Sequence, residues 1–316
     1  MTRIFAFLLA CAANLATANQ AFANAPTNPK MTEVQVASAL GEQRGEGQPY
    51  EVVGTEVWNV ADPKSGRDYQ VFVALPPSYD KETERRYPVL YVTDADYAFA
   101  MLRQITRRLN LDKPVVEEYI LVGLSYAIGE GGMPSRRRDY TPSLNGPNTD
   151  TPHGQGQQYL QYLAQSVFPF IADKYRTDEA RRLFLGHSYG GLLGAQAMFT
   201  APEMFSGLIL GSPSFWFDEH VMWSFEQRYA KSNKDLAARV YVYVGEYEDM
   251  KPGDERYATR YNMVTDARQF EKTLKQRGYP SLKLRLDVLN DEDHLSVAPR
   301  GFTHGLKFLL PAKGAK

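Results

Sequence analysis

The sequence contains a single cysteine, Cys11, which lies in an apolar stretch close to the N-terminus. If that stretch is removed as a leader, the mature chain has no thiol, which excludes disulfide bonds, cysteine nucleophiles and thiolate metal sites and suits an oxidising compartment. Cys11 follows Leu8-Leu9-Ala10. It is therefore either a passive apolar residue of the leader, the interpretation we favour, or a cysteine that receives a lipid anchor.

A strong charge bias and a long apolar run are also missing. Lysine and arginine together number 36, and aspartate and glutamate 37, which gives a net charge of −1. No global field therefore attracts nucleic acid or an anionic membrane. The apolar run from Ile4 to Ala13 is shorter than the roughly 20 residues that a transmembrane helix needs, and no later run approaches that length. We expect neither a nucleic-acid partner nor a transmembrane segment.

The first residues follow the pattern of a secretory signal peptide, with a cation at Arg3, the apolar run after it, and the small-x-small ending Ala21-Phe22-Ala23. We predict a signal peptide at residues 1–23, cleaved near Ala23, and a periplasmic or secreted protein. Residues 24–49 are rich in Gly, Gln, Asn, Ala and Thr without periodicity, and they predict an N-terminal tail or linker. One folded domain is expected at residues 50–312.

Apolar residues are plentiful, because 43% of the 316 residues are hydrophobic and 23% are charged, as in a globular chain with one large core. From Tyr50 onward, short β-branched or aromatic runs alternate with helix-length segments. This pattern predicts an α/β fold, an eight-stranded mostly parallel sheet with helices on both faces. The expected strands are Glu51–Trp58, Tyr69–Leu75, Val89–Thr93, Tyr119–Leu124, Arg182–Gly186, Gly207–Leu210, Val240–Val244 and Leu282–Leu289. The expected helices are Tyr97–Leu109, Gln155–Tyr175, Gly190–Thr200, Asp218–Tyr229, Asn262–Arg277 and Pro299–Leu310.

Two local features refine this prediction. Only a turn separates the first two expected strands, so they should pair antiparallel at one edge of the sheet. Pro169 lies inside the longest expected helix and should break or kink it at the preceding residue.

The segment Gly186-His187-Ser188-Tyr189-Gly190 matches the motif G-x-S-x-G, between an apolar strand and a run compatible with a helix. Such a nucleophile elbow holds a serine on a sharp turn, where glycines leave room for crowded backbone. The positive end of the following helix would face an oxyanion, with the Tyr189 N–H as one donor. Ser188 is therefore the predicted nucleophile, against the alternative of an ordinary strand-to-helix turn, and His187 is interpreted as packing the elbow.

A serine hydroxyl needs a histidine to take its proton, and in folds with this elbow the chain order is serine, acid, histidine. His294 lies in the polar loop after the last expected strand, and such loops gather at the sheet edge that carries the elbow. His304 lies within the last expected helix. His294 is therefore the predicted base, and a solvated loop histidine is the alternative.

The acid should follow the strand Val240–Val244, where Glu246, Glu248 and Asp249 compete. A carboxylate there fixes the tautomer of the imidazole and stabilises the imidazolium that forms during the reaction. The third position after Gly245 is the usual one in this fold, which favours Glu248, with Asp249 as the alternative acid.

A second oxyanion donor should come from the loop after the third expected strand, through the N–H of Ala95 or Asp96, between which the sequence does not choose. The chemistry needs no metal and no organic cofactor.

Further blocks carry a family resemblance. They are Tyr87-Pro88-Val89-Leu90-Tyr91-Val92-Thr93-Asp94, Arg136-Arg137-Arg138-Asp139-Tyr140-Thr141-Pro142, the run from Tyr159 through Gly191, and Gly211-Ser212-Pro213-Ser214-Phe215-Trp216-Phe217. The chain resembles the putative-esterase family of α/β hydrolases, which includes the bacterial catecholate-siderophore esterases that cleave enterobactin, salmochelin or bacillibactin. The resemblance implies the α/β-hydrolase fold and a Ser188–His294 pair, with an acid at Glu248, where family members vary. Many relatives have Leu-Asp-Gly where this chain has Thr93-Asp94-Ala95, and this departure affects the geometry of the second oxyanion donor.

The resemblance also suggests a substrate. A ferric tris-catecholate carries roughly three negative charges, which arginine meets best. Arg136, Arg137 and Arg138 lie in a loop expected after the fourth strand and could face the site; alternatively, one pairs with Asp139 and the others are solvated. Trp216 could offer a flat apolar surface to a catechol ring, although core packing is expected for at least two of the three neighbouring aromatic residues.

These observations predict an exported serine carboxylic-ester hydrolase that cleaves the trilactone esters of a catecholate siderophore such as ferric enterobactin, with iron entering only as part of the substrate. The alternatives are a general periplasmic carboxylesterase, an acyltransferase of the same fold, and, outside the enzymes, an exported siderophore-binding module. A competing acceptor alcohol would separate transfer from hydrolysis. A fluorophosphonate probe that failed to label Ser188 would favour the binding module.

Overall fold

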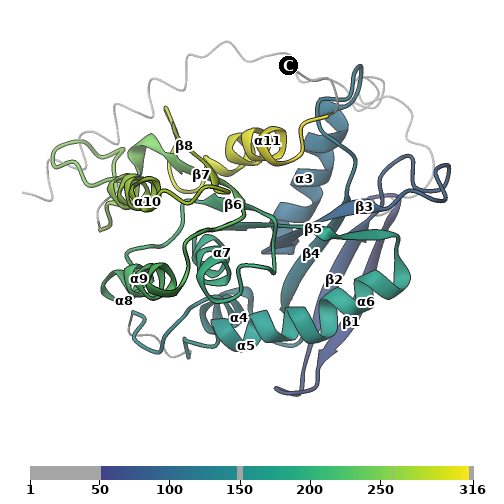
Figure 1. The fold of residues 1–316 in the computed structure, drawn as a ribbon, viewed down its shortest axis with the longest axis horizontal. Coiled ribbons are helices and arrows are strands. Elements are labelled where there is room, and N and C mark those ends of the chain that lie inside the picture. The colour runs from purple at the N-terminus through teal and green to yellow at the C-terminus, as the bar shows by residue number, and fades with distance from the viewer. Residues whose placement is uncertain (1–50, 148–151, 259, 313–316) are drawn as a thin grey trace, which may run out of the picture. The chain divides into compact units, whose positions relative to one another are not determined.

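The computed structural model describes residues 51–147, 152–258 and 260–312, and Figure 1 shows their arrangement. The predicted signal peptide, the predicted tail and Cys11 lie outside the described residues. One sheet organises the described chain. Its strands are β1 (Thr55–Asp62), β2 (Arg67–Ala74), β3 (Tyr87–Thr93), β4 (Ile120–Ala127), β5 (Thr177–His187), β6 (Gly207–Gly211), β7 (Arg239–Gly245) and β8 (Lys283–Leu289).

The strands lie in the order β1-β2-β4-β3-β5-β6-β7-β8, so β8 is the outermost strand at one end of the sheet. β1 pairs antiparallel with β2, and β2 pairs antiparallel with β4. The pairs from β4 to β8 are all parallel. The predictions of eight strands, an antiparallel edge and a mostly parallel remainder are confirmed. The carboxyl ends of the parallel strands therefore meet at one edge of the sheet.

Helices cover both faces of the sheet, as predicted. They are α3 (Ala95–Leu109), α4 (Gly132–Asp139), α5 (Gly156–Tyr162), α6 (Phe168–Lys174), α7 (Tyr189–Thr200), α8 (Phe217–His220), α9 (Met222–Ser232), α10 (Met263–Arg277) and α11 (Ala298–Leu309), with the π-helical turn η1 (Leu163–Val167) and the 3-10 turn η2 (Glu246–Glu248). In Figure 1, α3 and α11 lie together on one face, and α7, α9 and α10 lie on the other. Among the described residues, no helix has the length and apolar character needed to cross a bilayer.

Each face of the sheet has its own apolar core, because successive side chains of a strand point to opposite faces. In β3, Val89 and Tyr91 belong to the core under α7, whereas Leu90 and Val92 belong to the core under α11. All four side chains are fully buried. A central strand buried on both faces reads as a continuous apolar run, which is the pattern that predicted β3 from the sequence.

The kink or break predicted before Pro169 takes the form of a π-helical turn, and the chain remains helical from Gly156 to Lys174. α5 continues into the π-helical turn η1, and α6 begins at Phe168 with Pro169 in its first turn. Proline has no N–H and cannot continue the regular hydrogen-bond ladder of an α-helix, and here the irregular π-helical turn directly precedes it.

The structure corrects the predicted loop around Arg136, Arg137 and Arg138, because these residues form the helix α4. Its sequence contains Gly132, Pro134 and three arginines with no apolar periodicity, so it carries no amphipathic signal from which a helix could be predicted. The strand β1 also lies later than the predicted Glu51–Trp58. Its position follows the pairing with β2, in which Thr55 lies opposite Ala74 and Asp62 opposite Arg67.

Candidate active site

Ser188 occupies a strained turn between the end of β5 and the start of α7. Its backbone has φ 60° and ψ −118°, a region that costs a residue with a side chain on the order of 1–3 kcal/mol. Its N–H donates to the carbonyl of Gly211 at 2.8 Å, and its carbonyl accepts the N–H of Leu192 at 3.0 Å. An added Cβ at Gly186 would lie 2.2 Å from the carbonyl oxygen of Gly190, so the elbow leaves no room for a side chain at that position.

Glu248 and His294 are joined by a short hydrogen bond. Nδ1 of His294 lies 2.6 Å from one carboxylate oxygen of Glu248, which is 2% exposed. The other carboxylate oxygen accepts the hydroxyl of Ser212 at 2.6 Å and the N–H of Gly245 at 2.7 Å. Since both Glu248 oxygens have donors, the buried carboxylate is held in place and can orient the imidazole.

The other acidic and histidine candidates have different partners. One Asp249 oxygen accepts the N–H groups of Val264 and Thr265 at 2.9 and 3.0 Å, so Asp249 anchors the first turn of α10. Glu246 accepts the backbone N–H of Asp291 at 2.9 Å.

The last histidine of the chain belongs to another part of the molecule. His304 lies in α11, with Nδ1 3.4 Å from Asp287. Among the candidates weighed from the sequence, Glu248 and His294 are the acid and the histidine that the structure joins.

His294 lies next to the elbow. Its ring centroid is 4.6 Å from that of His187, the residue that precedes Ser188. The Ser188 Oγ lies 3.3 Å from the Oγ of Ser214, which is fully buried in the loop after β6. Within the described residues, no hydrogen bond joins Ser188 Oγ to His294, so the two groups must come within hydrogen-bond distance before a proton can pass between them. Ser212 and Ser214, which belong to a block of the family resemblance but were given no role from the sequence, contact the acid and the predicted nucleophile, respectively.

The predicted oxyanion donors lie on two neighbouring helix N-termini. Tyr189 is the first residue of α7, and Ala95 and Asp96 are the first two residues of α3. The first N–H groups of a helix lack acceptors within it and are available to an anion. The two helix starts are close, because an added Cβ at Gly190 would lie 2.3 Å from the hydroxyl oxygen of Thr93, just before α3. Both Ala95 and Asp96 remain candidates for the second donor.

Asp94 and Arg136 form a buried ion pair beside the elbow. Asp94 is 0% exposed and adopts a left-handed conformation, with φ 54° and ψ 47°. Arg136 donates to its two carboxylate oxygens at 2.9 and 3.2 Å, and Tyr126 donates its hydroxyl at 2.8 Å. Arg136 also donates to the backbone carbonyl of His187 at 3.4 Å. The Arg136 guanidinium group therefore binds groups of the protein itself, and it connects the loop after β3 to the elbow.

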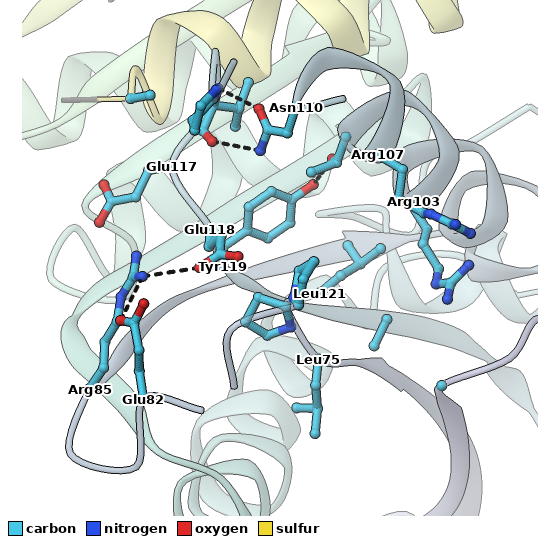
Figure 2. Close-up of a pocket in the computed structure, with 18 of the residues that line it drawn as sticks. Leu75, Glu82, Arg85, Arg103, Arg107, Asn110, Glu117, Glu118, Tyr119 and Leu121 are labelled. Carbon is cyan, nitrogen blue, oxygen red and sulfur yellow. Dashed lines mark hydrogen bonds and ion pairs between the residues drawn. The ribbon is translucent and has the colours of Figure 1, made fainter. Parts of the chain in front are cut away.

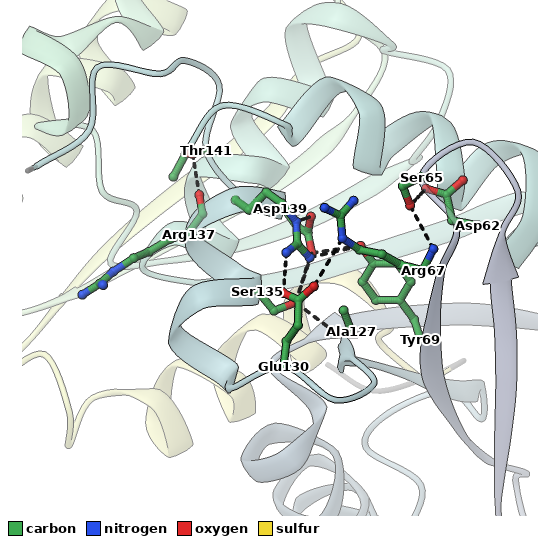
Figure 3. A network of polar contacts seen from close by, with 11 residues as sticks. Asp62, Ser65, Arg67, Tyr69, Ala127, Glu130, Ser135, Arg137, Asp139 and Thr141 are labelled. Carbon is green, nitrogen blue, oxygen red and sulfur yellow. Dashed lines mark hydrogen bonds and ion pairs between the residues drawn. The ribbon is translucent and has the colours of Figure 1, made fainter. Parts of the chain in front are cut away.

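Arg138 belongs to a separate polar network, which Figure 3 shows. It is 4% exposed, donates to Asp139 at 2.8 Å, and forms an ion pair with Glu130. Tyr69 donates its hydroxyl to Asp139 at 3.1 Å and thereby connects this network to β2. The expectation that one arginine pairs with Asp139 thus holds for Arg138, but the expectation that the others are solvated is wrong for Arg136, which forms a buried ion pair with Asp94.

The Arg137 side chain points away from this network in Figure 3. Burial lowers the pKa of His153, and the charge of Arg137 lowers it further. Burial raises the pKa of Tyr189, and Arg137 opposes that rise. Arg137 therefore lies near Tyr189, the first residue after the predicted nucleophile, as does Arg136, whose guanidinium carbon lies 5.4 Å from the centre of the Tyr189 ring.

The aromatic residues after β6 divide into core and surface positions. Phe215 and Phe217 are fully buried, as expected for at least two of the three, whereas Trp216 is half-buried. Trp216 stacks on Tyr261 with ring centroids 3.8 Å apart and an angle of 7°, and it lies 6.0 Å from the ring of Tyr189. This pair forms a flat, partly exposed aromatic surface next to the elbow.

A cavity of about 1120 Å³ lies away from Ser188, at the end of the sheet where the parallel strands begin. Its lining includes Leu75 after β2, Tyr119 just before β4, Leu121 near the start of β4, and Arg103 and Arg107 on the second half of α3 (Figure 2). Parallel sheets bind substrates at the carboxyl ends of their strands. This cavity therefore has no part in the proposed chemistry at Ser188.

Within the residues that the structure describes, no group of three or more histidine, cysteine, aspartate or glutamate side chains is placed to hold a metal ion. The side chains around Ser188 are those of acid–base and nucleophilic chemistry.

A family model described as "Putative esterase" matches residues 63–283. The ferri-bacillibactin esterase BesA of Bacillus subtilis (strain 168) is 24% identical over 282 residues, which cover 85% of this chain and 94% of that protein. The siderophore enterobactin esterase of Emericella nidulans is 25% identical over 294 residues, which cover 83% of this chain and 95% of that protein.

Solved structures share the architecture over nearly their whole length. The BES protein from Bacillus cereus aligns with a TM-score of 0.72 at 24% identity, covering 85% of this chain and 99% of its own. The siderophore hydrolase EstA from Aspergillus nidulans aligns with a TM-score of 0.72 at 23% identity, covering 85% of this chain and 98% of its own. At these identities, the likeness is one of fold.

Proposed function

The chain belongs to the putative esterase family and is a carboxylic ester hydrolase with the α/β-hydrolase fold, and we propose that it cleaves the esters of a catecholate siderophore through Ser188, His294 and Glu248. The family resemblance and the fold predicted from the sequence are confirmed. The observation that carries the catalytic proposal is the buried Glu248 carboxylate, 2.6 Å from Nδ1 of a histidine that lies beside the strained serine turn.

The hydrogen bond to Glu248 places the imidazole proton on Nδ1 of His294, because a carboxylate only accepts. Nε2 of the neutral ring then carries a lone pair and takes the proton of Ser188 Oγ as that oxygen bonds to the ester carbonyl carbon. The carbonyl oxygen becomes an oxyanion, held by the Tyr189 N–H and an N–H of Ala95 or Asp96. The imidazolium is stabilised by the adjacent negative charge of Glu248.

The tetrahedral intermediate collapses when the bond to the leaving alcohol breaks and His294 gives that alcohol its proton. An acyl group then remains on Ser188. His294 next removes a proton from water, the hydroxide attacks the acyl carbon, and the second collapse returns the proton to Ser188 Oγ. The cycle consumes one ester bond and one water molecule.

The siderophore part of the proposal rests on the names of the relatives and on the surroundings of the elbow. The two curated relatives act on bacillibactin and enterobactin, as their names state. In this chain, Arg137 and the stacked Trp216 and Tyr261 lie near Tyr189. A cation beside flat rings suits an anionic catecholate. Iron would enter with the substrate, and the predicted signal peptide would place the reaction in the periplasm or outside the cell.

The test compares the purified mature protein on iron-loaded enterobactin, iron-free enterobactin and a short-chain nitrophenyl ester. We expect a higher kcat/KM on a trilactone than on the nitrophenyl ester, and loss of hydrolysis of all three in Ser188→Ala. A Ser188→Ala variant with wild-type rates would remove Ser188 as the nucleophile. Equal kcat/KM values on all three esters would instead leave a general esterase.

A further inference from the structure

His187, the last residue of β5, uses both ring nitrogens within the protein. Its Nδ1 lies 3.2 Å from the hydroxyl of Tyr243, and its Nε2 lies 2.9 Å from the backbone carbonyl oxygen of His294. His187 is 8% exposed and Tyr243 is 0% exposed. A buried side chain one residue before the nucleophile therefore holds the backbone of the histidine that acts as base.

The partners of His187 fix its tautomer. A carbonyl oxygen only accepts hydrogen bonds, so Nε2 must carry the proton that it donates to His294. In a neutral ring, Nδ1 is then an acceptor, and the Tyr243 hydroxyl donates to it. Burial lowers the pKa of His187 well below its usual value, and the neighbouring charges of His294 and Arg136 lower it further. The surroundings therefore favour a neutral ring.

Tyr243 is itself closely packed and connected to the acid. An added Cβ at Gly211 would lie 2.0 Å from its hydroxyl oxygen, so the ring fills the space that the glycine leaves. The Tyr243 carbonyl accepts the N–H of Ser212 at 2.7 Å, and the Ser212 hydroxyl holds Glu248 at 2.6 Å. Tyr243 thus contacts Ser212, which positions Glu248, and it also contacts His187, which binds the backbone of His294.

The loop that carries His294 faces solvent on its outer side, where Leu295 is 87% exposed. The Asp293 carboxylate accepts the N–H groups of Leu295 and Ser296 at 2.8 and 2.9 Å. These bonds shape the loop from within, but they do not connect it to the strand that carries Ser188. The hydrogen bond from His187 makes that connection, one residue from the nucleophile.

We propose that His187, oriented by Tyr243, is a positioning residue that sets the distance between His294 and Ser188 by donating Nε2–H to the His294 carbonyl. Each turnover requires that Ser188 Oγ and His294 Nε2 come within hydrogen-bond distance, because a proton passes between them. The inference rests on the proposed use of Ser188 and His294, and it does not depend on which ester is the substrate.

Two amide variants of His187 separate this role from packing. Glutamine places its amide nitrogen near the position of Nε2 and can still donate to the His294 carbonyl. Asparagine is shorter and reaches only the position of Nδ1, so it loses that bond while remaining a polar amide. A misplacement on the order of 1 Å can cost about 10²-fold in rate. We therefore expect His187→Asn to lose about that factor in kcat with little change in KM, and His187→Gln to retain most of the activity.

The measurement uses the full mature protein, with kcat and KM on a nitrophenyl ester, the rate of fluorophosphonate labelling of Ser188, and the melting temperature of each variant. Tyr243→Phe keeps the ring and removes the donor to Nδ1, so it should give an intermediate loss of kcat and of labelling rate. Equal losses in His187→Gln and His187→Asn would overturn the positioning role, as would wild-type kcat in His187→Asn and Tyr243→Phe.

A Ser188→Ala control distinguishes the two proposals. If Ser188→Ala is inactive while His187→Asn is fully active, the positioning proposal alone fails. If Ser188→Ala is as active as the wild type, the serine mechanism fails and the positioning proposal fails with it. The positioning proposal is supported if the loss of kcat is largest in His187→Asn, intermediate in Tyr243→Phe and smallest in His187→Gln, and if the melting temperatures do not follow this order.

Discussion

Replacing Glu248 with glutamine tests which carboxylate serves His294. One Glu248 oxygen accepts both the Ser212 hydroxyl and the Gly245 N–H, and the other accepts His294 Nδ1. In Glu248→Gln, the amide oxygen can keep the first two bonds, and the NH₂ group then faces His294. Two donors cannot bond to each other, so the imidazole proton moves to Nε2, and the ring can no longer take a proton from Ser188.

The size of the effect follows from this wrong tautomer. We expect kcat to fall by about 10⁴-fold, the loss seen when a triad acid becomes its amide with the geometry kept. This corresponds to about 5 kcal/mol of activation free energy. Because the two bonds from Ser212 and Gly245 remain, the free energy of unfolding should change little. The expected signature is a large loss of activity in a protein that stays folded.

Asp249→Asn is the matched control, because it makes the same chemical change at the neighbouring residue. Asp249 accepts the N–H groups of Val264 and Thr265 at the start of α10, and an asparagine oxygen can keep both bonds. The loss of a negative charge at a helix N-terminus should cost about 0.5 kcal/mol of stability. We expect kcat close to the wild-type value.

The assay is steady-state hydrolysis of a nitrophenyl ester, with urea unfolding of each variant as the measure of stability. The reasoning would be refuted if Glu248→Gln kept more than about a tenth of the wild-type kcat, because a wrong tautomer leaves far less. It would also be refuted if Asp249→Asn lost as much activity as Glu248→Gln.

Three further outcomes can be measured. Gly186→Ala should lower the free energy of unfolding by about 1–3 kcal/mol and reduce activity, because its Cβ would meet the Gly190 carbonyl oxygen at 2.2 Å; wild-type activity and urea unfolding would contradict this. Arg136→Ala should cost about 3–5 kcal/mol in urea unfolding, because it leaves the fully buried Asp94 carboxylate without its ion pair; a change below about 1 kcal/mol would contradict this. The pKa of His187 is lowered in the folded chain, so below its usual value of 6.5 the unfolded chain binds a proton that the folded chain does not, and stability falls as the pH falls. Urea unfolding at neutral and acidic pH should show a smaller fall in His187→Gln, and an unchanged fall would count against it.

The features that the sequence predicts best are those coded by local pattern. The elbow around Ser188 depends on glycines within two residues of the serine, and β5 and α7 on either side have clear apolar patterns. His294 and Glu248 were found by their positions after β8 and β7, because strand-end loops of a parallel sheet converge. The structure joins these two residues, although it does not show the hydrogen bond expected between His294 and Ser188 Oγ.

The features that the sequence does not reveal are pairs of residues far apart in the chain. Asp94 lies 42 residues before Arg136, and nothing near either residue indicates that the two form an ion pair. The helix α4 lacks apolar periodicity, and its arginines instead pair with acidic residues such as Asp94. The contacts of Tyr243 with His187 also depend on how β5 and β7 lie across the sheet, which the strand order alone does not determine.

The position of β8 has a consequence for how the protein responds to heat. Among the described strands, β8 pairs with β7 alone, and Lys283, Arg285 and Asp287 along it carry charges that discourage a foreign strand from adding to that edge. A strand bonded on one side exchanges its amide protons and opens more readily than strands in the middle of a sheet. Since the loop after β8 holds His294, warming should loosen this part of the site before it opens the strands in the middle of the sheet. Activity should therefore be lost on heating while the inner strands remain ordered.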